Sequence, residues 1–335
     1  MSSQFLALSL EDRSDILLAH AANSGRSAQI LEKDVWVCWV LDALFTMPGA
    51  LSMAFKGGTS LSKVYNAIDR FSEDVDITLD YRQLDDSVDP FAESTSRKQQ
   101  DHLSKHLREL VAVHITEKIA PYFIARLASE FGFESEAVRA DDENVWINYP
   151  SALRDNDEYV KEVVKLEFGG RNSIEPSDRH TIAPYLAELP TIVVPSATVT
   201  VLAAERTFWE KATLIHTELK RGEFRSGAER LSRHWYDLDR LARTDIGQRA
   251  LADYPLLRDV VKVKKVFYRS GHANYDHCVS GKLRLVPTDE AVVKHLQDDY
   301  AEMVSAKMFY EDPPPFSEIL EHLEILADHI NTTIV

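Results

Sequence analysis

The sequence is poor in cysteine and has no long apolar run, and each shortage excludes a class of protein. Among its 335 residues only Cys38 and Cys278 are cysteines, so a disulfide framework is not expected and the cytoplasm is the default compartment. No apolar run approaches the roughly 20 residues that a membrane span needs. Residues 1–23 lack the basic start and the small-residue cleavage site of a secretory signal. We expect a cytoplasmic globular protein with no membrane partner.

Positive charge is also scarce. Against 54 Asp and Glu there are 38 Lys and Arg, which gives a formal net charge of −16. A protein that coats nucleic acid relies on a basic surface, so this class is disfavoured, although a local basic cleft is compatible with the composition. The densest basic cluster lies in residues 262–269 and is a candidate contact for nucleic acid or an acidic partner. A solvated helix face is the alternative for its members, Lys262, Lys264, Lys265 and Arg269.

Residues 54–80, AFKGGTSLSKVYNAIDRFSEDVDITLD, carry the first chemical signal. The pattern predicts an apolar strand at 51–55, a glycine turn, a helix at 59–68 and a second strand at 75–79. Glycine lets a backbone approach a ligand closely, and the N–H groups of a helix start favour phosphate. The turn is therefore a candidate phosphate cradle, with a plain turn as the alternative, and it consists of Gly57, Gly58, Thr59 and Ser60.

The second signal is Asp74-Val75-Asp76 at the start of the second strand. Alternate side chains of a strand point to the same face, so the two carboxylates share a side. Mg²⁺ prefers oxygen ligands and often takes one or two carboxylates together with substrate phosphates. A solvated strand edge would explain the pair alone. Combined with the phosphate cradle before it, the pair indicates phosphoryl or nucleotidyl transfer.

These motifs carry a family resemblance. The glycine turn followed by Asp-x-Asp resembles the GG/GS…DxD signature of DNA polymerase β-like nucleotidyltransferases. A longer pattern, KGGTSL at 56–61 followed by FSEDVD at 71–76, resembles that of the AbiEii-type toxins. These are the nucleotidyltransferase halves of bacterial toxin–antitoxin and abortive-infection systems. The resemblance implies that Asp74 and Asp76 are catalytic and hold Mg²⁺ or Mn²⁺. It implies that the nucleotide contacts Lys56, Gly57, Gly58, Thr59, Ser60 and Ser72.

Further strands are predicted at 145–149, 163–168, 191–194 and 198–202. In the second of these, apolar residues alternate with Lys165 and Glu167, which should share the outer face. Polymerase β-like enzymes place a third carboxylate on a neighbouring strand, so the resemblance makes Glu167 a candidate metal ligand. A cross-strand salt bridge is the alternative.

Two later segments complete the resemblance. A helix is predicted at 204–219. The resemblance maps the lysine motif of the family onto Glu205, Glu210 and Lys211 in this helix. It implies that Lys211 neutralises charge on the phosphates. A helix predicted at 229–243 carries Arg233 and Asp237, which share a face at this spacing. The resemblance implies that Asp237 assists acceptor activation and that Arg233 holds Asp237 or the nucleotide. The alternatives are a solvated face and a surface ion pair.

The remaining pattern is mostly helical. Helices are predicted from a capping box at Ser9 to about 22, then at 27–45, 98–131, 290–308 and 316–330, with a break or a kink at Pro121. Residues 81–100 are predicted to be an exposed connection or flap, and 222–227 a basic, glycine-containing loop. In the second helix Trp36 and Trp39 should anchor the core, while the charges at 32–34 should be solvated.

The sequence therefore predicts an α+β fold: a nucleotidyltransferase domain with a mixed sheet in residues 1–200 and a helical domain in 201–335 that contributes to the active-site cleft. The resemblance implies a metal-dependent nucleotidyltransferase toxin that transfers NMP from an NTP to RNA, with the tRNA 3′ end as acceptor and a cognate antitoxin as partner. The alternatives are nucleotidylation of a protein side chain and a non-catalytic NTP-binding module.

Overall fold

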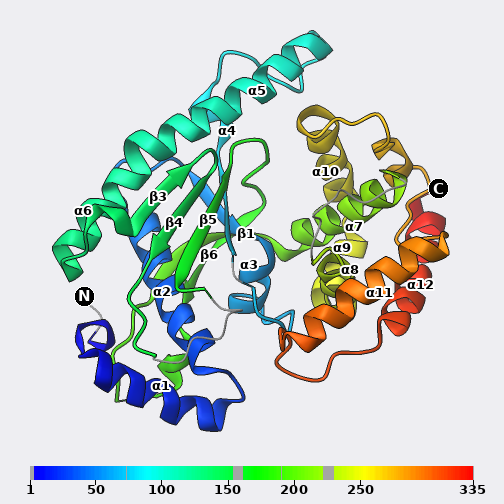
Figure 1. Ribbon diagram of the computed structural model, residues 1–335. Helices are drawn as coiled ribbons and strands as arrows, with labels where there is room; N and C mark the ends of the chain where they lie inside the picture. Colours follow the sequence, from blue (N-terminus) through cyan, green and yellow to red (C-terminus); the bar gives the residue numbers. More distant parts are fainter. Residues whose placement is uncertain (1–3, 73, 154–160, 190, 222–229, 335) are drawn as a thin grey trace. The chain divides into compact units, whose positions relative to one another are not determined.

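A computed structural model describes residues 4–72, 74–153, 161–189, 191–221 and 230–334 (Figure 1). The chain forms two compact units. The first comprises Met1–Val64, Phe71–Val88 and Lys105–Leu202. The second comprises Tyr65–Arg70, Asp89–Ser104 and Ala203–Val335. Two short segments of the first 200 residues thus belong to the second, largely helical unit.

The first unit is built on one mixed sheet of seven strands. In spatial order the strands are β3 (Val138–Asp141), β4 (Asn144–Asn148), β5 (Val163–Gly169), β2 (Asp74–Leu79), β1 (Met53–Lys56), β7 (Ala197–Leu202) and β6 (Ser177–Ile182). The strand pairs β5–β2 and β1–β7 are parallel, and all other neighbouring pairs are antiparallel. The α+β fold with a mixed sheet is therefore confirmed.

The sequence pattern locates the inner strands better than the edges. The predicted strands at 145–149, 163–168 and 198–202 correspond to β4, β5 and β7. The strand predicted at 191–194 is wrong, because these residues form no strand. The two edge strands, β3 and β6, were not predicted. Both are exposed along much of their length, so they lack the strong apolar alternation of a strand with a buried face.

Helix α2 (Ala28–Phe45) is almost entirely buried and contacts β5 and β7. Trp36 and Trp39 are core residues as predicted, and the Trp36 ring stacks on Tyr149 with 5.3 Å between centroids. The helix begins where Ser27 accepts a hydrogen bond from the Ile30 amide. The preceding helix, α1 (Leu10–Ser24), begins at the predicted cap, where the Ser9 hydroxyl accepts from the Asp12 amide.

The charges at 32–34 are buried, so their predicted solvation is wrong. Glu32 accepts hydrogen bonds from the Ser151 hydroxyl at 2.6 Å and the Ala152 amide at 2.7 Å. Asp34 pairs with Lys63 at 2.7 Å and accepts from the Tyr185 amide. Buried charges are tolerated when they are paired and hydrogen-bonded. These contacts join α2 to distant segments of the first unit.

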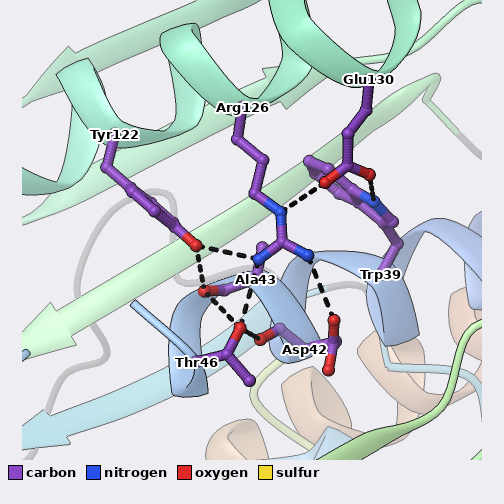
Figure 2. Close-up of polar contacts among 7 residues, drawn as sticks. All are labelled: Trp39, Asp42, Ala43, Thr46, Tyr122, Arg126 and Glu130. Carbon is purple, nitrogen blue, oxygen red and sulfur yellow. Dashed lines mark hydrogen bonds and ion pairs between the residues drawn. The ribbon is translucent and has the colours of Figure 1, made fainter. Parts of the chain in front are cut away.

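A polar cluster joins α6 (Ala120–Phe131) to α2 (Figure 2). The Arg126 guanidinium donates to Glu130 at 2.7 Å and to Asp42 at 3.2 Å, and also to the Tyr122 hydroxyl. Glu130 in turn accepts from the Trp39 indole at 2.9 Å. The long predicted helix is α5 (Arg97–His114), a π-helical turn (Ile115–Ile119) and α6 in succession, so Pro121 follows an irregular turn but does not end the helix.

The second unit is helical around α7 (Ala204–Arg221), which contacts α8 (Arg233–Ala242), α9 (Asp245–Ala252) and α10 (Tyr254–Phe267). The predicted helices at 204–219, 290–308 and 316–330 are confirmed. The predicted loop at 222–227 and the predicted start of the helix at 229 lie outside the described residues.

The remaining helices of the two units, within the described residues, are α3 (Gly57–Lys63), α4 (Tyr81–Leu84), α11 (Glu290–Ser305), α12 (Phe316–Ile334) and the 3₁₀ turns Phe5–Ala7, Ser135–Ala137, Tyr185–Glu188 and Tyr275–Val279.

No helix within the described ranges is long and apolar enough to cross a membrane.

Candidate functional site

Helix α3 begins directly after β1, and its first two residues are Gly57 and Gly58. It is shorter than the predicted helix at 59–68, because it ends at Lys63, and Asn66 adopts the left-handed conformation with φ 48°. Gly57 itself has φ +78°. A Cβ at this position would lie 1.9 Å from Oδ2 of Asp76, so the Asp76 carboxylate rests directly against the Gly57 backbone. The start of α3 and an acidic group of β2 are therefore adjacent.

Gly57→Ala tests whether this close approach is required. We expect a loss of about 2–3 kcal/mol in unfolding free energy, since alanine would be strained at this φ and would also displace Asp76. Urea denaturation measures the loss. Gly132→Ala is the matched control: Gly132 has φ +70° but nothing within 4 Å of the added Cβ, so only backbone strain of about 1 kcal/mol is expected. Equal losses in the two variants would contradict a specific role for the Gly57–Asp76 contact.

The acidic pair lies on one face of β2, as predicted. Val75 is buried, whereas Asp74 and Asp76 are half-buried. The register places Asp76 opposite Lys56 on β1 and Glu167 on β5. Residues in register on neighbouring strands project to the same face, so Glu167 lies on the acidic face beside Asp76.

Glu167 forms an ion pair with Lys165 Nζ of its own strand, β5, rather than the cross-strand salt bridge considered as the alternative. Lys165 lies opposite Asp74 in the register. Among the described residues no three His, Cys, Asp or Glu side chains form a group that could hold a metal ion. The side chains at this face that could bind a metal ion are therefore Asp74 and Asp76. Glu167 lies next to them but is paired with Lys165.

The hydroxyls of Thr59 and Ser60 are used inside the fold. Thr59 Oγ1 donates to the carbonyl oxygens of Asp74, at 2.5 Å, and Ser72, at 3.3 Å. Ser60 Oγ donates to the Gly57 carbonyl at 2.9 Å, and both side chains are buried. Thr59 thus fixes the first turn of α3 to the strand that carries the acidic pair. Nucleotide contact by these residues stays a prediction, and the N–H groups of the first turn are the donors that suit it.

In the second unit Asp237 is the centre of a buried charge cluster. Its carboxylate is fully buried and accepts two hydrogen bonds from the Arg70 guanidinium, each of 2.7 Å. Lys211 Nζ lies 2.7 Å from the second carboxylate oxygen. Lys211 and Asp237, both predicted site residues, are therefore in direct contact. The solvated lysine and the surface ion pair considered as alternatives are both wrong, because the cluster is buried.

Arg70 is the member that the sequence did not reveal. It lies 167 residues from Asp237, between Asp69 and Phe71, and no periodicity marks it. Arg233, the partner expected from its spacing, is half-buried. Within the part of the chain that the structure describes, the Arg233 guanidinium has no ion pair. The predicted pairing of Arg233 with Asp237 is thus replaced by pairing with Arg70 and Lys211.

The cluster shifts the pKa of its members. Burial alone would raise the pKa of the Asp237 carboxyl, but the charges of Arg70 and Lys211 outweigh it and hold this pKa well below its usual range. Burial lowers the pKa of the Lys211 ammonium, Asp237 opposes this in part, and Arg70 adds to it. Burial and the charges of Lys211 and Arg233 also place the pKa of His234 well below its ordinary value. His234 is therefore a neutral imidazole beside the charged cluster.

The other residues of the lysine motif are used elsewhere. Glu205 pairs with Arg249 at 2.6 Å, and Glu210 pairs with Arg206 at 3.4 Å. Lys211 is therefore the one member of this motif that joins the Asp237 cluster among the contacts described above.

In this protein a mixed sheet places an Asp-x-Asp pair against a helix that begins with glycine. This arrangement is suited to nucleotidyl transfer. The family model described as "Nucleotidyl transferase AbiEii toxin, Type IV TA system" matches residues 39–322. The chain therefore belongs to the AbiEii family of nucleotidyltransferase toxins of type IV toxin–antitoxin systems.

Among solved structures, the chain is similar to MenT4, a nucleotidyltransferase toxin from Mycobacterium tuberculosis H37Rv. The two are 16% identical, the match covers 98% of this chain and 99% of that chain, and the TM-score is 0.37. No curated protein matches the sequence.

Proposed function

We propose that the protein acts in the cytoplasm as a toxin that transfers NMP from an NTP to an RNA acceptor, the 3′ end of tRNA, and that a cognate antitoxin restrains it. Family membership supports nucleotidyl transfer. The observation that carries the assignment of the site is the contact between the Asp76 carboxylate and the Gly57 backbone. It joins an acidic face to the start of a helix, where N–H groups favour phosphate.

The residues of this face fit a divalent metal. Asp74 and Asp76 present hard carboxylate oxygens on one half-buried face, and Mg²⁺ commonly takes one or two carboxylates while keeping waters and substrate phosphates. We assign Asp74 and Asp76 to hold Mg²⁺ or Mn²⁺, with Glu167 as a further carboxylate on the neighbouring strand. When bound, such a metal stabilises negative charge on the transferring phosphoryl group.

The nucleotide is assigned to the α3 end of this face. The N–H groups of Gly57, Gly58 and Thr59 would face the phosphates, and Lys56 lies opposite Asp76 in the register. Ser60 and Ser72 border the same turn and complete the proposed nucleotide contacts.

Lys211, Arg233 and Asp237 are assigned to the later steps. Lys211 would neutralise charge that develops on the phosphates, and Arg233 would contact the nucleotide. A carboxylate whose pKa is strongly depressed is a poor general base near neutral pH. Asp237 therefore assists acceptor activation by orienting Lys211 rather than by removing a proton.

The position of the label on the NTP tests the reaction type. Purified protein is incubated with deacylated tRNA, Mg²⁺ and each of the four NTPs, labelled at either the α- or the γ-phosphate. Nucleotidyl transfer predicts that tRNA acquires α-label but no γ-label and gains the mass of whole nucleotides. We expect EDTA to abolish labelling and excess Mg²⁺ to restore it. Transfer of γ-label would indicate phosphoryl transfer and would contradict the proposal.

A second candidate acceptor is a protein side chain. The net charge of −16 favours it, because an acidic surface repels RNA at long range. Mass spectrometry of proteins incubated with the enzyme and NTP separates the two acceptors. A nucleotide adduct on protein, with no labelled tRNA, would favour this second candidate.

A further inference from the structure

An open groove of about 690 Å³ lies on the second unit. One wall comes from residues 90–100, which lead into α5, and the other from residues 258–276, which include most of α10 and the turns after it. Both segments belong to the second unit. The acidic face of the sheet contributes no residue to this α10 groove.

The α10 groove is basic in an otherwise acidic chain. Its lining includes one acid, Asp276, and five cations, Arg97, Arg258, Lys262, Lys265 and Arg269. All five cations are exposed. Two of them have acidic neighbours: Lys265 lies 2.6 Å from Asp276, and Arg269 lies 3.4 Å from Asp101. The groove therefore concentrates positive charge that the rest of the chain lacks.

Three cations of the groove are available to a ligand. Arg97, Arg258 and Lys262 have no ion pair within the residues that the structure describes. Lys262 Nζ lies 4.7 Å from the centroid of the Phe91 ring on the opposite wall, which holds the ammonium at the groove. Arg258 and Lys262, the two of these on α10, can therefore be changed without breaking an internal ion pair.

The cations form a row. Arg258, Lys262 and Lys265 are spaced by four and three residues, so they share one face of α10, and Arg269 follows just beyond the helix end. At 1.5 Å per residue the row extends over about 16 Å. Neutral hydrogen-bonding side chains also line the groove, namely Thr95, Gln100, Ser270 and Asn274.

We propose that the α10 groove binds the phosphate backbone of the acceptor RNA. This proposal depends on the proposed function in one respect, namely that the acceptor is RNA. A strand of RNA presents anionic oxygens at regular intervals along a line, which matches a row of cations on one helix face. Most protein–nucleic acid hydrogen bonds go to phosphate and sugar, from the same side-chain types that line this groove. The groove would hold the acceptor, while the acidic face carries the reaction.

The test compares two double variants of the full-length protein with the same net charge. Arg258→Glu/Lys262→Glu reverses the two unpaired groove cations on α10. Lys282→Glu/Lys294→Glu reverses two exposed lysines that do not line the groove. Binding of bulk deacylated tRNA is measured by fluorescence polarisation without NTP, over a series of KCl concentrations. Poly-L-glutamate serves as the probe for acidic protein, and circular dichroism confirms that both variants fold.

For a single strand, the logarithm of the association constant falls with the logarithm of the salt concentration by about 0.7 for each phosphate contact. One contact therefore raises the affinity about fivefold when the salt concentration falls from 1 M to 0.1 M. We expect the groove variant to bind tRNA at least about tenfold more weakly than the control variant at 0.1 M KCl. Its salt slope should be smaller by about 1.4, for the loss of two contacts. Equal affinities and slopes would overturn the proposal. So would a groove variant that loses only poly-L-glutamate binding, since the occupant would then be an acidic protein.

The outcome is separable from that of the transfer assay. Wild type that binds tRNA through the groove but transfers no label would support the groove and refute the proposed function. Wild type that labels tRNA, with the same KM for tRNA in both double variants, would refute the groove and leave the proposed function intact.

Discussion

Asp76→Asn is expected to abolish nucleotide transfer, with a loss of at least about 10³-fold in kcat, which corresponds to about 4 kcal/mol of transition-state stabilisation. Asparagine has the shape of aspartate, so it fits against Gly57, where a Cβ would already be too close to Oδ2. It lacks the charge, and a neutral amide oxygen is a weaker ligand for Mg²⁺ than a carboxylate. Label transfer from an α-labelled NTP to tRNA measures the loss.

The matched control for this variant is Asp178→Asn. Asp178 is an exposed aspartate of β6 in the same sheet, and it lies at the far edge from the acidic face. We expect full activity from this control and a change in unfolding free energy within about 1 kcal/mol for either variant. Transfer by Asp76→Asn at the wild-type rate would remove Asp76 from the mechanism. A loss of fold in Asp76→Asn would make the carboxylate structural rather than catalytic.

Asp237→Ala is expected to lower the unfolding free energy by about 3–5 kcal/mol. The substitution leaves the buried cations of Arg70 and Lys211 without their shared carboxylate, and an uncompensated buried charge is strongly destabilising. Guanidinium chloride denaturation at pH 7 measures the change. Asp69→Ala is the control, because Asp69 pairs with Arg240 where the two side chains are 40% and 38% exposed, and should cost less than about 1 kcal/mol.

The contribution of Asp237 should also depend on pH. Its pKa is depressed in the folded state, so the stabilisation is fully present above the pKa of an unfolded aspartate, about 3.9, and is lost as pH falls below that value towards the folded pKa. The difference between wild type and Asp237→Ala should therefore shrink at pH 3 relative to pH 7. A difference that stays constant between these two pH values would contradict the charged cluster.

Local patterns of the sequence were sufficient for the elements that carry the acidic face. Alternation of apolar and polar residues predicts β5, and the same period places Asp74 and Asp76 on one side of β2. Ser9 predicts the start of α1 because a cap acts on its own first turn. In each case the determining contacts lie within a few residues, so the sequence pattern records them.

The misses have a common physical cause, which is contact between residues far apart in the chain. Asp34 is buried because Lys63 and Tyr185 supply its partners, and neither is near it in sequence. Arg70 reaches Asp237 across 167 residues, so no spacing rule could pair them. Arg233, one helical turn from Asp237, was the natural expectation from local geometry alone. Tertiary pairing determined the cluster, and local periodicity does not encode it.

The course of the chain restricts how this toxin could be dissected. Five times the backbone passes from one unit to the other, and Arg70 lies in a six-residue excursion, Tyr65–Arg70. A fragment starting at Ala203 would contain Asp237 and Lys211 but would have lost the guanidinium that anchors them. Neither unit can therefore be excised as a continuous fragment. A chimaera that exchanges the helical unit between family members would also have to exchange residues 65–70.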